Sequence, residues 1–99
     1  MFVSVRRYHN VTNDPAKVEE LRALSEEELL PVFKENPGFR GYHVVKNGGD
    51  LVAIAIFDNR ESALRSIEQA AAWVQKISDE HMPPVSDTVT GETIISHSV

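Results

Sequence analysis

Three side chains in this 99-residue sequence are of types that bind or activate small organic molecules, namely His43, Arg7 and Trp73. Imidazoles exchange protons near neutral pH and can deprotonate a phenol or an activated C–H group, which makes His43 the candidate catalytic base. Arginine holds oxyanions and carboxylates, so Arg7 is a candidate substrate-binding residue. Trp73 follows the alanines at 70–72, and a large ring beside small side chains can wall a pocket for a flat aromatic ligand.

Each of these residues also has a plain structural interpretation. His43 could be a hydrogen-bonded histidine of the core, and Arg7 could form an ion pair with glutamates of the first helix. Trp73 could fill the seam between helix and sheet, or a subunit contact. The elements that carry the three residues must therefore be placed before a site can be assigned.

Hydrophobic patterns and turn residues divide the chain into four strands and two helices. Residues 2–8, 39–46, 51–58 and 85–99 have strand character, and the last of these segments is expected to bend at Gly91. The tetrad NGGD at 47–50 predicts a tight turn that joins the second and third strands as a hairpin.

Capping residues mark the two helices. Asp14 and Pro15 are expected to start the first helix, and Pro31 should kink or interrupt it. Ser25 and Glu28 form a capping box that would restart this helix just before the proline. Asp58, with a glutamate three residues later, is expected to cap the second helix, which should end before Met82.

The element order is β-α-β-β-α-β, which predicts one α+β domain over residues 1–99 with the ferredoxin-like arrangement. Two helices would cover one face of a four-stranded antiparallel sheet. In the third strand, LVAIAIF at 51–57, the residues pointing to either face are all apolar. With no third helix to cover the second face, we expect a homodimer formed through the sheet faces.

Alternation along the strands assigns the candidate residues to faces. His43 shares a face with Phe39 and Val45, and this less polar face is expected to meet the helices. On the first strand the set that contains Arg7 is expected to face the helices, which turns Arg6 toward the partner subunit. His43, Arg7 and Trp73 would then meet in a cavity between the second helix and the sheet.

Four segments carry a family resemblance that spans nearly the whole chain: PGFRGYHVV, the GGD hairpin, FDNRESA and GETIISH. The chain resembles small bacterial proteins of the dimeric α+β barrel superfamily, in the antibiotic-biosynthesis-monooxygenase-like (ABM-like) group. The resemblance implies a ferredoxin-like dimer. The best-known members of the superfamily oxidise polycyclic aromatic substrates without metal or flavin, some degrade haem, and many have no known activity.

Two functional classes follow from the resemblance. One is a cofactor-independent monooxygenase that acts on a small aromatic or polyketide-like substrate; the other is a non-catalytic, small-ligand-binding or stress-related dimer. Haem degradation is not expected, because the tryptophan and the haem-ligating histidine of the haem-degrading relatives align with Ser66 and Lys76 here. His81 lies near the second of these positions but beyond the expected end of the helix.

Composition excludes several other classes. The net charge of −5 argues against nucleic-acid partners, which require clustered lysine and arginine. No apolar run approaches the roughly 20 residues of a membrane span and the N-terminus does not resemble a signal peptide, so a cytoplasmic protein is expected. There is no cysteine, and the four histidines lie in different elements without paired spacing, so neither a metal site nor another cofactor is expected.

The missing ligand spacing predicts that the purified protein carries neither metal nor haem. Elemental analysis should find no stoichiometric metal, and added haem should keep the Soret band of free haem. A stoichiometric transition metal, or a shifted Soret band, would contradict this prediction.

Overall fold

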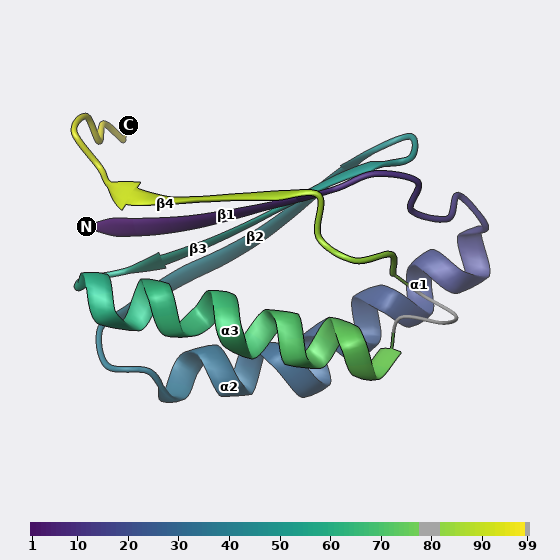
Figure 1. Cartoon of the computed structure of the whole chain (residues 1–99), viewed down its shortest axis with the longest axis horizontal. Helices are drawn as coiled ribbons and strands as arrows, with labels where there is room; N and C mark the ends of the chain where they lie inside the picture. Colours follow the sequence, from purple (N-terminus) through teal and green to yellow (C-terminus); the bar gives the residue numbers. More distant parts are fainter. Residues whose placement is uncertain (78–81, 99) are drawn as a thin grey trace.

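The computed structural model describes residues 1–77 and 82–98 and confirms the predicted α+β, ferredoxin-like fold (Figure 1). The first predicted helix is broken into three consecutive pieces over residues 15–35, which together are called the first helical layer. In chain order the elements are β1 (Phe2–Tyr8), α1 (Pro15–Leu24), a π-helical segment (Ser25–Leu29), α2 (Leu30–Glu35), β2 (Phe39–Asn47), β3 (Asp50–Phe57), α3 (Arg60–Ile77) and β4 (Asp87–Glu92).

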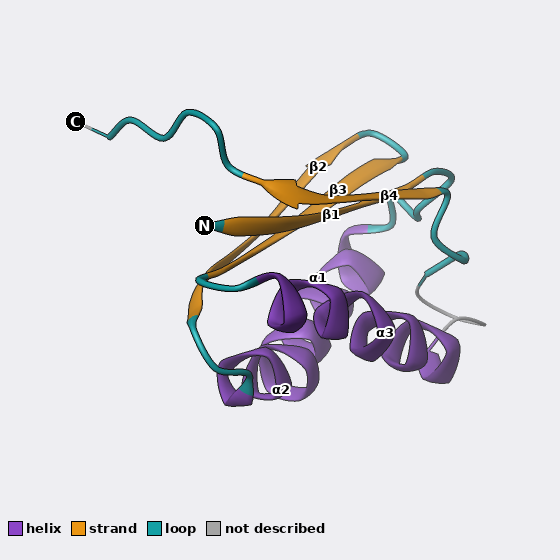
Figure 2. Ribbon diagram, turned by 60° about the vertical axis from the view of Figure 1, so that its left-hand side comes forward, coloured by secondary structure: helices purple, strands orange, loops and turns teal. Residues whose placement is uncertain are grey.

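The four strands form one antiparallel sheet in the order β2-β3-β1-β4. All helices lie on one face of this sheet, and the opposite face carries no helix in the described part of the chain (Figure 2). The predicted hairpin is confirmed, because β2 ends at Asn47 and β3 begins at Asp50 with Gly48 at a φ of 58°. A positive φ of this kind suits glycine.

The third strand has the two apolar faces that its sequence predicts. Its helix-facing residues are almost fully buried; they are Leu51, Ala53, Ala55 and Phe57. Val52, Ile54 and Ile56 point to the open face and are only half-buried. Neighbouring strands add further aliphatic side chains to this open face, including Val45 and Val89, which are 58% and 54% exposed. One chain therefore leaves a large part of an apolar sheet face uncovered.

The predicted faces of β1 and β2 are both wrong. On β1 it is Arg6, with Ser4 and Tyr8, that is buried under the helices, whereas Arg7 is exposed on the other side. The prediction failed because it assigned the apolar residues of β1 to the helix-facing side. The open face is itself apolar and carries both valines of this strand. Burying an arginine there runs against the usual preference of charged side chains for the surface.

A β-bulge reverses the expected faces of β2. The register passes from Phe39 opposite Phe57 to Gly41 opposite Ile56, so Arg40 is an extra residue on this strand. An inserted residue shifts the alternation by one position. Phe39 therefore packs toward the helices as expected, whereas His43 lies exposed on the open face.

The break in the first helical layer takes a different form from the predicted capping box. Asp14 caps α1 as expected, accepting a hydrogen bond of 3.0 Å from the backbone N–H of Ala16. Ser25 is not an N-cap, because the chain stays helical through it and widens into the π-helical segment. Pro31 lies in the first turn of α2, where the lack of an N–H is tolerated.

The second predicted helix begins one residue later than expected. Asn59 caps α3 by accepting a hydrogen bond of 2.8 Å from the backbone N–H of Ser62, and Asp58 instead forms an ion pair with Arg40 at 2.8 Å. The predicted end of this helix falls in residues 78–81, which lie outside the described part of the chain together with His81. β4 passes Gly91 and ends at Glu92, so the predicted final strand is shorter than 85–99.

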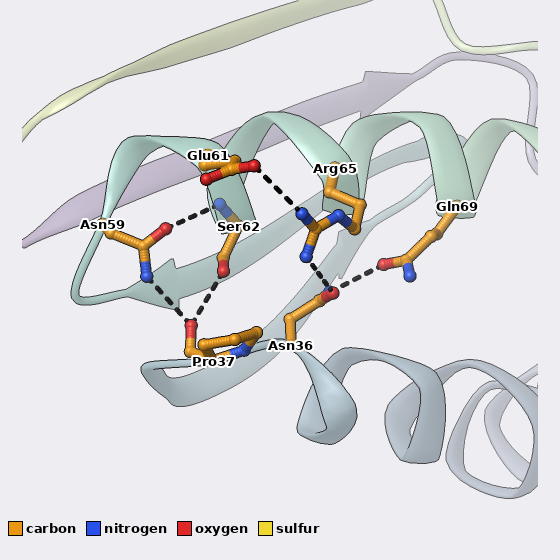
Figure 3. Close-up of polar contacts among 7 residues, drawn as sticks. All are labelled: Asn36, Pro37, Asn59, Glu61, Ser62, Arg65 and Gln69. Atoms are coloured by element: carbon orange, nitrogen blue, oxygen red, sulfur yellow. Dashed lines mark hydrogen bonds and ion pairs between the residues drawn. The ribbon is translucent and has the colours of Figure 1, made fainter.

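A polar cluster fastens the loop after α2 to the start of α3 (Figure 3). The carbonyl oxygen of Pro37 accepts hydrogen bonds from the Asn59 amide at 3.0 Å and the Ser62 hydroxyl at 2.8 Å. Asn36, which is buried, donates to the side chain of Gln69 at 2.7 Å and accepts from Arg65 at 3.4 Å. These bonds fix where β2 enters the sheet.

Gly38 makes this loop sensitive to substitution. It has a φ of 77°, and a Cβ there would lie 2.8 Å from the Cβ of Asp58. Gly38→Ala should therefore lower the free energy of unfolding by about 2–4 kcal/mol, which combines the left-handed backbone with overpacking.

Gly48→Ala is the matched control, since this glycine also has a positive φ but nothing lies within 4 Å of the added Cβ. It should cost only about 1–2 kcal/mol. Urea denaturation measures both changes. Equal losses of unfolding free energy in the two variants would show that the close approach at Gly38 does not contribute to stability.

Candidate ligand cavity

A cavity of about 400 Å³ lies between the first helical layer and the sheet. Its walls come from α1, the π-helical segment and the helix-facing side of β1, β2 and β3, and α3 contributes Trp73. Most of the lining is apolar, including Leu21, Leu51 and Ala53. A volume of this size accommodates a small organic ligand.

A buried arginine forms the polar centre of the cavity. The side chain of Arg6 is part of a residue only 4% exposed, and its guanidinium donates hydrogen bonds to the hydroxyl oxygens of Tyr8 at 2.7 Å and Tyr42 at 3.2 Å. Its Cζ also lies 5.7 Å from the centre of the Tyr8 ring and 5.9 Å from that of Phe33. Such cation–π contacts favour the charged guanidinium.

Small residues of β3 let Arg6 reach across the sheet. Arg6 on β1 is opposite Ala53, whose neighbour on β2 is Val44, and Tyr42 is opposite Ala55. The arginine side chain therefore passes over the alanines of the central strand to meet Tyr42 two strands away. Larger residues at 53 or 55 would occupy this path.

Two further contacts hold Tyr42. Tyr42 packs edge-on against Phe33 with ring centres 5.1 Å apart, and its hydroxyl lies 3.3 Å from that of Ser25 in the π-helical segment. Burial raises the pKa of Tyr8, although the charge of Arg6 opposes this rise. Tyr8 is therefore a neutral phenol over the whole physiological range and keeps its O–H as a donor.

No carboxylate among the described residues forms an ion pair with Arg6. The two glutamates that line the cavity, Glu19 and Glu26, pair instead with Arg22, at 3.0 Å and 2.9 Å. The charge at the centre of the cavity is thus left without an anionic partner from the described chain.

Trp73 is partly buried and lies in the wall of this cavity, not of the cavity beneath the alanines of the second predicted helix where the sequence placed it. Its Nε1–H donates a hydrogen bond of 3.0 Å to Glu28 in the π-helical segment, which ties α3 to the first helical layer. Departures from regular α-helix of this kind are frequent near functional sites. The tryptophan therefore has both a structural role and a position in a cavity wall.

The other two predicted site residues lie elsewhere. His43 and Arg7 are both on the open face of the sheet and do not line this cavity. Arg6, which the sequence assigned to the partner-facing side, occupies the place expected for Arg7. Arg6 and Arg7 differ in the face of β1 on which they lie. No feature of the sequence determines which of these faces meets the helices.

The space expected beneath the alanines of α3 exists as a second cavity of about 350 Å³. Ala71 lines it, but Ala70 is fully buried in the core and Trp73 lines the first cavity instead. Arg6 and Tyr8 line both cavities, whereas Tyr42 borders only the first.

Within residues 1–77 and 82–98, no three histidine or acidic side chains are grouped in a way that could hold a metal ion. No helix of this described part is long and apolar enough to cross a membrane.

Comparison of the sequence with protein-family models and with curated proteins finds no match. Solved structures do match. HapK from Hahella chejuensis superposes with a TM-score of 0.68 at 14% identity, over 100% of this chain and 98% of its own. SnoaB, a cofactor-independent oxygenase from Streptomyces nogalater, gives 0.63 at 17% identity over 96% and 94%.

A third solved structure, named an antibiotic biosynthesis monooxygenase, gives a TM-score of 0.63 at 14% identity over 96% of this chain and 100% of its own. At such identities the similarity shows the fold. This chain thus has the fold of these solved structures over essentially its whole length, and several of the matching structures are named antibiotic biosynthesis monooxygenases.

Proposed function

We propose that the protein is a cofactor-independent monooxygenase that acts on a small aromatic or polyketide-like substrate. The observation that carries the proposal is the cavity beside the sheet, which combines apolar walls and an aromatic side chain with a buried guanidinium. The fold shared with SnoaB, a protein named a cofactor-independent oxygenase, supports the same class.

The proposed reaction converts a ring methylene that is conjugated with a phenol or enol into a carbonyl. Loss of one proton gives a carbanion that reduces dioxygen directly; one oxygen atom enters the carbonyl, and the other leaves as water with the two methylene hydrogens. Arg6 and Tyr8 stabilise the substrate oxyanion, which lowers the free energy of deprotonation. Trp73 aligns the flat ring, and the apolar walls exclude water from the anion.

The open sheet face supports the proposal that the working unit is a homodimer. Its aliphatic residues include Ile54, and the tail after β4 exposes Ile94 and Ile95 at 92% and 83%. Apolar surface of this kind is typical of an interface. In such a dimer His43 and Arg7 would lie between the two sheets. A catalytic role for His43 stays a prediction, and it would require a substrate bound at this interface.

A non-catalytic, ligand-binding dimer is the second candidate. It is favoured by one observation: no histidine occurs among the described residues that line the cavity, and both glutamates there are paired with Arg22. The cavity therefore offers an anion-stabilising cation without an evident side-chain base. The same cavity would then hold its ligand without reaction.

Oxygen uptake separates the two candidates. The protein, without added metal, flavin or haem, should consume dioxygen with a hydroxylated anthrone or naphthol, and isotope labelling should place one oxygen atom from dioxygen in the product.

Arg6→Met should lower kcat/KM by about tenfold to a hundredfold, because a charge-assisted hydrogen bond to the developing anion is lost. Thermal shifts with the same compounds, but no oxygen uptake, would favour the binding protein.

Light scattering tests the dimer. The wild type should have twice the chain mass of 11.1 kDa at micromolar concentration, and Ile54→Lys should give monomer or aggregate, because it places an unpaired charge in the interface. Leu64→Lys is the control, since Leu64 lies on α3 and is 46% exposed. A wild-type monomer would refute the sheet-face dimer.

A further inference from the structure

We infer that Arg6, Tyr8 and Tyr42 form an oxyanion site, and that the ligand of the cavity is an acidic phenol or enol bound as its anion. The inference rests on the proposed ligand cavity and names the chemical class of what binds there. It stands on three features of the described chain: an unneutralised buried cation, hydrogen-bond donors left over beside it, and apolar walls around it.

The charge of Arg6 is the first feature. Guanidinium stays protonated in proteins, and charged side chains are almost never fully buried unless they are paired. Arg6 is 4% exposed, yet no carboxylate of the described residues pairs with it. Two tyrosine hydroxyls solvate this charge but do not neutralise it. An anionic ligand supplies the partner that the described residues do not.

The remaining donors are the second feature. A guanidinium has five N–H groups, and the hydrogen bonds of Arg6 to Tyr8 and Tyr42 use two of them. Its Nε–H donates to no described residue, and no fully buried side-chain nitrogen or oxygen of the described chain lacks a partner. Nε must therefore be reached from open space. The Tyr8 hydroxyl accepts from Arg6 and keeps its own proton to donate.

The surroundings select the kind of anion. Leu51, Ala53 and Trp73 give the cavity apolar walls, which suit a flat ring system better than a small inorganic anion. At the rim, Arg22 pairs with both Glu19 and Glu26 and offsets one of their two negative charges, which reduces the repulsion of an entering anion. Lys46, which also lines the cavity, adds a positive charge on β2. The combination fits one ionised oxygen on an aromatic or quinonoid ring.

Trp73 provides a site-specific signal for the test, because it is the single tryptophan of the sequence. Its fluorescence is titrated at neutral pH with two probes of nearly equal shape. 2-Hydroxy-1,4-naphthoquinone is an acidic enol that is ionised at this pH, whereas 2-methoxy-1,4-naphthoquinone has no proton to lose. The wild type should bind the hydroxy compound about tenfold or more tightly, as expected for one charge-assisted hydrogen bond.

Neighbouring arginines supply the matched variants. Arg6→Met should abolish the preference while changing the affinity for the methoxy compound less than threefold. Arg7→Met removes the same charge from the opposite face and should leave the preference unchanged. If Arg6→Met does not fold, as judged by circular dichroism, Tyr8→Phe takes its place, because it keeps the cation, removes one donor and should reduce the preference severalfold.

Equal wild-type affinities for the two probes would overturn the oxyanion site but leave the cavity proposal intact. A preference that survives Arg6→Met, or that is lost in Arg7→Met, would also overturn it. No change of Trp73 fluorescence with either probe up to millimolar concentration would contradict the proposed ligand cavity itself, and the oxyanion site with it.

Discussion

The candidate site depends on the alanines of the central strand. Ala53 lies between Arg6 on β1 and Val44 on β2 and lines the cavity, and Ala55 lies opposite Tyr42, so the small side chains of β3 leave a hollow on its helix-facing side. The hollow lets the side chain of Arg6 cross from β1 to Tyr42 on β2, and it leaves room for the cavity beneath α1. Replacing either alanine by a leucine would fill this path at the cost that overpacking carries.

The two faces of the sheet carry different residues, and local backbone geometry decides which residues lie on each face. The bulge at Arg40 turns Tyr42 toward the helices and His43 toward the open face. The ion pair of Arg40 with Asp58 and the bonds around Pro37 hold the chain where it enters β2. Residues far from the cavity thus determine that a phenol, and no imidazole of β2, borders the cavity.

Element order, the hairpin at 47–50 and the two apolar faces of β3 could be predicted from the sequence, because periodicity and turn chemistry are local signals. The alanines beside Trp73 predicted a cavity wall, but the ring lines the cavity under α1 and not the one beside Ala71. The face of β1 could not be predicted, because Val3 and Val5 are apolar residues of an open face. The bulge that redirects His43 has no signature in a single sequence. Assigning β1 to the wrong face was therefore enough to exchange Arg6 and Arg7.

The central claim, that the buried guanidinium of Arg6 is held for an anionic ligand, is tested most directly by a crystal structure of the complex with 2-hydroxy-1,4-naphthoquinone. The account predicts the ionised oxygen within hydrogen-bond distance of Arg6 and Tyr8, with the ring system beside Trp73. A ligand bound on the open sheet face near His43 and Arg7, or a protein carboxylate paired with Arg6, would contradict it.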